Sequence, residues 1–100
     1  DPQEVIFQLN NNNALLLDLR NEKEFSKGKI SQAIYIGPNI ENCKKEIDKI
    51  SDRPVILFCQ NGVKSDEFSK ELKKSEIKVF ILKGGINTWV ADGLPLLDKY

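Results

Sequence analysis

Cys59 lies between an apolar run and a polar, glycine-bearing turn in the segment ILFCQNGVKSDEF, residues 56–68. The chain contains no histidine, the residue that most often activates a nucleophilic cysteine. A helix N-terminus or a neighbouring lysine can replace the imidazole, because both stabilise the anionic form of a thiol. The segment therefore indicates a cysteine nucleophile that works without an imidazole.

The residues after Cys59, which complete the segment CQNGVKS, are expected to form a loop that leads into a helix with Ser65 as its N-cap. The N–H groups of such a loop converge on the sulfur. Gly62 allows backbone conformations closed to other residues, and Lys64 adds a positive charge. The pattern predicts a cradle for a small anion, whose candidate binding residues are Gln60, Asn61, Gly62, Val63, Lys64 and Ser65.

A structural interpretation of Cys59 competes with this one. A cysteine at the end of a buried strand is often only a small hydrophobic residue, and burial alone favours that interpretation. The glycine, the lysine and the serine that follow at suitable spacing favour function instead.

Composition limits the class of protein. A length of 100 residues with 40% hydrophobic and 30% charged residues fits one soluble domain spanning residues 1–100. The 15 basic and 15 acidic residues balance, so nucleic acid is not an expected partner. No apolar run approaches the roughly 20 residues that span a bilayer. A cytoplasmic location is expected, although the chain begins without methionine and an upstream signal or membrane anchor stays open.

Strand-like and helix-like segments alternate along the chain. Continuous apolar runs, typical of strands covered on both faces, occupy residues 14–19, 33–36, 54–58 and 78–82. Helices are expected after caps at Asp1 and Asn21, over residues 39–50, from Ser65 onward, and from Gly84 to a stop at Gly93 and Pro95. This order predicts an α/β fold with a mostly parallel sheet of four to five strands and helices on both faces. In such a sheet, ligands bind beyond the carboxyl ends of the strands, where Cys59 is placed.

The second cysteine, Cys43, recurs at helical spacing with Ile40, Ile47 and Ile50, which predicts a buried and inert thiol. A role as a resolving thiol would require a proximity to Cys59 that the sequence does not show. Both thiols are expected to be reduced, because a domain with this aliphatic content needs no disulfide. Two distant cysteines without histidine cannot supply a usual zinc site, and no other cofactor is expected.

Three segments resemble the rhodanese family. CQNGVKS resembles its active-site loop C-x-x-G-x-R-S, in which lysine sometimes replaces the arginine. LLDLRNEKEFSKGKISQAIYI is similar to D-x-R followed by E-[FY]-x-x-G-H-I-x-G-A-x-x-I, and LKGGINTWVADGLPL to L-x-G-G-x-x-x-W-x-x-x-G-x-P. The resemblance covers residues 5 to 96. The departures are Lys64 for arginine, Lys29 for histidine and Gln32 for glycine, and Lys29 and Gln32 are expected in a structural turn.

The resemblance implies a rhodanese-like fold and a sulfurtransferase that carries sulfane sulfur as a persulfide on Cys59. It implies that the N–H groups from Gln60 to Ser65 hold the outer sulfur and that Lys64 favours an anionic donor such as thiosulfate. The implied acceptor is a thiol or cyanide-like compound, with a thioredoxin-like protein among the candidates. Asp18 and Arg20 match the D-x-R positions and could shape the loop mouth, but a structural ion pair is an equal interpretation.

Two other functions compete with sulfur transfer. A non-catalytic rhodanese-like sulfur carrier or protein-docking module is the main alternative, and the retained cysteine favours catalysis over it. Phosphatases and arsenate reductases of similar fold have a loop one residue longer that ends in arginine. Here four residues separate Cys59 from Lys64, and that position has no guanidinium to clamp phosphate oxygens. The surface lysines Lys44, Lys45, Lys70, Lys73 and Lys74 are interpreted as solvated helix faces, and Trp89 as a core residue.

Overall fold

A computed structural model describes residues 2–49, 53–72 and 78–94. The helices are α1 (Pro2–Asn11), α2 (Glu22–Phe25), α3 (Ile40–Ile47), α4 (Val63–Leu72) and α5 (Gly85–Ala91). The strands are β1 (Leu15–Asp18), β2 (Ile34–Tyr35), β3 (Val55–Phe58) and β4 (Val79–Ile81). The predictions made for Asp1, Ile50, Lys73, Lys74 and Pro95 lie outside the described residues.

The strands form one sheet in the order β2-β1-β3-β4, and each neighbouring pair is parallel. In the centre of the sheet, Leu17 of β1 pairs with Leu57 of β3, which pairs with Ile81 of β4. Every residue of β1 and β3 is buried, as expected for strands covered on both faces. The predicted α/β fold with a parallel sheet is confirmed, with four strands in the described residues.

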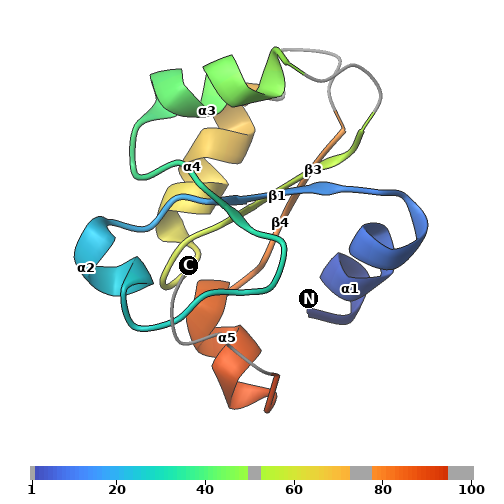
Figure 1. Cartoon of the computed structure of the whole chain (residues 1–100), viewed down its shortest axis with the longest axis vertical. Helices are drawn as coiled ribbons and strands as arrows, with labels where there is room; N and C mark the ends of the chain where they lie inside the picture. Colours follow the sequence, from blue (N-terminus) through green and yellow to red (C-terminus); the bar gives the residue numbers. More distant parts are fainter. Residues whose placement is uncertain (1, 50–52, 73–77, 95–100) are drawn as a thin grey trace.

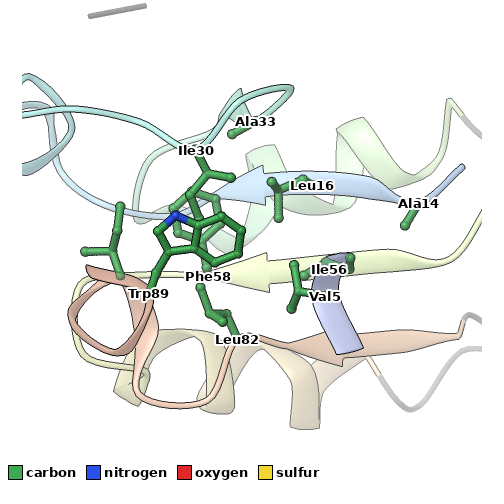
Figure 2. Close-up of a cluster of buried hydrophobic side chains, with 10 residues drawn as sticks. Val5, Ala14, Leu16, Ile30, Ala33, Ile56, Phe58, Leu82 and Trp89 are labelled. Carbon is green, nitrogen blue, oxygen red and sulfur yellow. The ribbon is translucent and has the colours of Figure 1, made fainter. Parts of the chain in front are cut away.

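Alternate side chains of the two central strands enter two separate cores. Leu16, Ile56 and Phe58 contact Val5 of α1 and Trp89 of α5 on one face (Figure 2). The opposite core contains Leu15, Leu17, Val55 and Leu57 with apolar residues of α3 and α4. Figure 1 shows these helix pairs on opposite sides of the sheet, which confirms the prediction of helices on both faces. Each large apolar side chain buried in this way contributes roughly 1.5–3 kcal/mol.

Asparagine side chains begin two of the helices. Asn21 Oδ1 accepts the N–H of Glu24 at 2.8 Å, and Glu24 Oε1 accepts the N–H of Asn21 at 3.3 Å. This reciprocal pair is the capping box that the sequence predicts for α2. Asn39 caps α3 by accepting the N–H groups of Glu41 and Asn42. These caps fix where the chain turns after β1 and before α3.

The turn before β2 contains one of the departures from the rhodanese pattern. Gln32 lies in the expected turn with φ 73°, in the left-handed region that glycine adopts most readily. A side chain there costs about 1–2 kcal/mol, which explains why the pattern has glycine at this position. The expectation of a turn is wrong for Lys29, because its backbone pairs in an isolated β-bridge before the chain turns.

Among the described residues, no helix has both the length and the apolar character needed to cross a membrane.

Candidate active site

Cys59 directly follows β3, at the carboxyl end of the parallel sheet. The residues that follow β1, from Leu19 onward, leave the sheet at the same edge, because Asp18 pairs with Phe58 in register. The loop from Cys59 to Gly62 then leads into α4. The fold therefore brings the Cys59 loop and the segment after β1 together where ligands of parallel α/β sheets bind.

The sulfur of Cys59 contacts hydrogen-bond donors of its own loop. The N–H of Gly62 donates to Sγ at 3.1 Å, and the N–H of Ser65 donates to it at 3.5 Å. The Ser65 hydroxyl oxygen lies 3.6 Å from Sγ. Although Cys59 is only 4% exposed and borders an apolar core, its sulfur is not enclosed by hydrocarbon alone. These N–H donors at the start of α4 give the sulfur a polar environment.

The prediction that Ser65 caps the helix is wrong. Helix α4 begins at Val63, whose N–H donates to Asn61 Oδ1 at 3.1 Å. The Asn61 side chain therefore takes over the first helical N–H, and the helix starts two residues before Ser65. Ser65 is fully buried in the first turn, where its hydroxyl donates to the carbonyl oxygen of Gly62 at 3.1 Å. This position turns the Ser65 N–H toward the sulfur rather than toward solvent.

The start of α5 packs against the Cys59 loop through backbone hydrogen bonds. The N–H of Ile86 donates to the carbonyl oxygen of Cys59 at 2.9 Å, and the N–H of Asn87 donates to that of Gln60 at 3.1 Å. Gly85 has φ +65°, and a Cβ there would collide with the Cys59 carbonyl oxygen. Gly62 also has a positive φ, +91°, and a Cβ added there would lie 2.8 Å from the backbone nitrogen of Gly84. The glycines of LKGG thus permit direct backbone packing, a role that the sequence pattern did not reveal.

A cavity of about 390 Å³ opens onto Cys59. The residues that line it come from the Cys59 loop, from the segment around α2, and from α4 and α5: Leu19, Arg20, Asn21, Glu24, Pro38, Cys59, Gln60, Asn61, Val63, Lys64, Glu67 and Asn87. Of the predicted binding residues, Gly62 and Ser65 do not line the cavity and instead contact the sulfur through their N–H groups. The Gln60 side chain is held by Asn87, to whose Oδ1 it donates at 2.7 Å.

Charged side chains of both signs line this cavity. Lys64 contributes the ammonium group predicted from the sequence, and its Nζ lies 5.7 Å from the centroid of the Phe68 ring. Glu24 and Glu67 also line the cavity, and sequence reasoning did not assign either to the site. The position of Glu67 three residues after Lys64, on the same helical face, was the signal that could have indicated it.

Asp18 and Arg20 form a buried ion pair. Arg20 Nη2 lies 2.8 Å from Asp18 Oδ2, and Arg20 Nε donates to Asp18 Oδ1 at 3.0 Å. The guanidinium also donates to the carbonyl oxygens of Glu24 and Gly28, at 3.2 and 2.7 Å. These bonds hold the chain around α2 and favour the structural interpretation of the pair, although Arg20 also borders the cavity. In the described ranges, no group of three or more potential metal ligands is present.

The two free thiols lie in different surroundings, which predicts different reactivity. Cys43 is fully buried in the core beneath α3, as predicted, and this burial raises the pKa of its thiol to about 11. Cys43 therefore stays protonated up to nearly that pH, whereas Cys59 faces both the cavity and N–H donors. We expect iodoacetamide at pH 8 to add one group, at Cys59. Peptide mass mapping checks this, and modification of Cys43 in the folded protein at that pH would contradict it.

Residues 1–92 match the family model of the rhodanese-like domain. The chain belongs to the rhodanese-like domain family. It is 30% identical to the thiosulfate sulfurtransferase GlpE of Glaesserella parasuis over 97 residues, which cover 95% of this chain and 88% of that protein. It is 34% identical to the uncharacterized protein YibN of Escherichia coli, with 89% of this chain covered. The matched part spans 64% of the length of YibN.

A solved structure shows the same fold. The thiosulfate sulfurtransferase of Pseudomonas aeruginosa superimposes with a TM-score of 0.81 over 99% of this chain and 19% of that one, at 24% identity. The fold of this chain is therefore the rhodanese-like fold that the sequence resemblance implied. Its relatives by sequence include proteins named as sulfurtransferases.

Proposed function

We propose that this chain is a sulfurtransferase that moves sulfane sulfur from a small anionic donor such as thiosulfate to a thiol or cyanide-like acceptor. The observation that carries the proposal is the Cys59 sulfur, which lines a cavity and accepts N–H groups from Gly62 and Ser65. The similarity to a thiosulfate sulfurtransferase supports it.

The reaction is a double displacement at Cys59. With thiosulfate, the Cys59 thiolate attacks the outer sulfur, a sulfur–sulfur bond forms, and sulfite leaves with the electron pair of the broken bond. The acceptor then attacks the outer sulfur of the persulfide, and the Cys59 thiolate is released. Cyanide would leave as thiocyanate by this route. No oxidant, reductant or metal is required, because every step exchanges one sulfur bond for another.

N–H groups of the loop are the proposed ligands of the outer sulfur. Within the described part of the chain, the N–H groups of Gln60, Asn61 and Lys64 have no hydrogen-bond acceptor. The N–H of Val63, in contrast, donates to the side-chain oxygen of Asn61. A second, anionic sulfur in the cavity would supply an acceptor. The N–H groups of Gly62 and Ser65 already donate to Sγ, so the two sets divide between the inner and outer sulfur.

The alternative is a docking module without catalysis. Such a module needs no polar surroundings for the cysteine, whereas the N–H contacts and the cavity at Cys59 suit a reacting sulfur. Steady-state kinetics with thiosulfate and cyanide test the proposal. Thiocyanate formation that gives parallel double-reciprocal lines is the expected result, and the absence of turnover with every sulfane donor tried would contradict it.

Lys64→Ala is expected to raise the KM for thiosulfate roughly three- to tenfold, because a partly exposed ammonium attracts the donor by a screened Coulomb interaction. The melting temperature should stay within a few degrees of the wild type, since the side chain is partly exposed and its ammonium group lies over the Phe68 ring of its own helix. Lys64→Arg keeps the charge and serves as the matched control. An unchanged KM in Lys64→Ala would show that the charge does not assist the donor.

A further inference from the structure

The charges around the cavity do not form a strongly cationic site. Arg20 borders the cavity, but its guanidinium is paired with the buried Asp18. The remaining charged groups in the lining are the ammonium of Lys64 and the carboxylates of Glu24 and Glu67. Two carboxylates beside one ammonium weaken the attraction for a compact dianion such as thiosulfate, so a donor that also carries a positive charge matches the lining better.

Glu67 is the carboxylate available to a ligand. Glu24 accepts the N–H of Asn21 in the capping box of α2. Glu67 is exposed on α4, three residues after Lys64, and makes no ion pair with the described residues. Since residues three apart on a helix lie on one face, an ammonium and a carboxylate lie next to each other in the cavity lining.

We propose that Lys64 and Glu67 together favour a zwitterionic donor, an amino-acid persulfide such as cysteine persulfide, over donors that lack an ammonium group. This inference rests on the sulfurtransferase function proposed above. Lys64 faces the donor carboxylate and Glu67 its ammonium group. The cavity volume of about 390 Å³ is that of a site for a small organic molecule rather than for one inorganic anion. Amide side chains of Asn21, Asn61 and Asn87 complete its polar walls.

The transfer step remains balanced with this donor. The Cys59 thiolate attacks the terminal sulfur of the persulfide, and a bond forms between the two sulfurs. The bond between the terminal and inner sulfur of the donor breaks, and cysteine leaves as its thiolate with the electron pair. Glu67 touches no reacting atom, so it acts as a specificity-determining residue rather than as a catalytic one.

Two donors that differ in one charge test the proposal. Cysteine persulfide carries the ammonium group, and N-acetylcysteine persulfide lacks it while keeping the carboxylate and the reacting sulfurs. The rate at which each donor adds one sulfur to the protein is measured by quenched-flow intact mass analysis. The wild type is expected to favour cysteine persulfide by about three- to tenfold, and this preference should shrink at high ionic strength.

Glu67→Gln is expected to abolish most of this preference and to raise kcat/KM for thiosulfate by about threefold. Glu71→Gln is the matched control, because Glu71 lies one turn further along α4, pairs with Lys44 and does not line the cavity. It removes the same charge and should leave the preference intact.

The outcomes separate the inference from the function on which it rests. Equal rates with the two persulfides in the wild type, or the same preference in Glu67→Gln, would overturn the role of Glu67 while sulfur transfer stands. If no donor adds sulfur to the wild type, the proposed function itself fails.

Discussion

Cys59→Ser is expected to lower thiosulfate-dependent sulfur transfer by at least about a thousandfold. A hydroxyl oxygen cannot form the persulfide, so no intermediate connects the donor step to the acceptor step. The change is nearly isosteric, and the N–H groups of Gly62 and Ser65 can donate to the serine oxygen. The fold should therefore persist, and thiocyanate formation by wild type and variant at equal protein concentration measures the effect.

Cys43→Ala is the matched control for this variant. Cys43 is fully buried and does not line the cavity, so its loss should cost about 1–2 kcal/mol of unfolding free energy without loss of turnover. If Cys59→Ser retained wild-type activity, or if Cys43→Ala lost it while folded, the assignment of the nucleophile would be wrong.

Gly85→Ala is expected to lower the free energy of unfolding by roughly 2–4 kcal/mol and to reduce sulfur transfer in the protein that remains folded. The new Cβ would meet the Cys59 carbonyl oxygen and lie 2.7 Å from the Gln60 carbonyl carbon, both backbone atoms that cannot turn aside. Relief of the clash requires the loop to move away from α5. That movement shifts Cys59 and Gln60, whose carbonyl groups are bonded to α5.

Gly93→Ala is the control that has the cost of a side chain at positive φ but no clash. Gly93 has φ +77°, similar to the +65° of Gly85, but a Cβ there meets nothing within 4 Å. Its replacement should therefore cost only about 1–2 kcal/mol, with unchanged kinetics. Urea denaturation of both variants gives the comparison. Equal losses would show that the close contact between the Cys59 loop and α5 has no energetic importance.

The fold was predictable because its central strands carry continuous apolar sequence. Residues 14–19 and 54–58 need cover on both faces, and the helical segments between the strands supply it. The ends of the helices were less predictable, since they depend on which side chain accepts the first helical N–H. Asn61 does so before Ser65, and α4 begins two residues earlier than the cap pattern indicates.

The candidate site was predictable only where it is local in sequence. The segment from Cys59 to Ser65 contains the sulfur and the N–H groups that contact it, so its pattern indicated them. The walls of the cavity come from distant segments, and the packing of α5 on the loop depends on backbone contacts of Gly85. The charge balance of the cavity lining likewise arises from tertiary structure, because Glu24 of α2 and Glu67 of α4 both line the cavity.

We propose that Cys59, whose sulfur accepts loop N–H groups, reacts with sulfane sulfur without help from a histidine. Intact-mass analysis after incubation with thiosulfate or cysteine persulfide tests it most directly. We expect a mass increase of one sulfur atom that dithiothreitol removes, that maps to Cys59, and that is absent in Cys59→Ser. A protein that gains no sulfur from either donor, or that gains it equally in Cys59→Ser, would show that Cys59 does not carry sulfane sulfur.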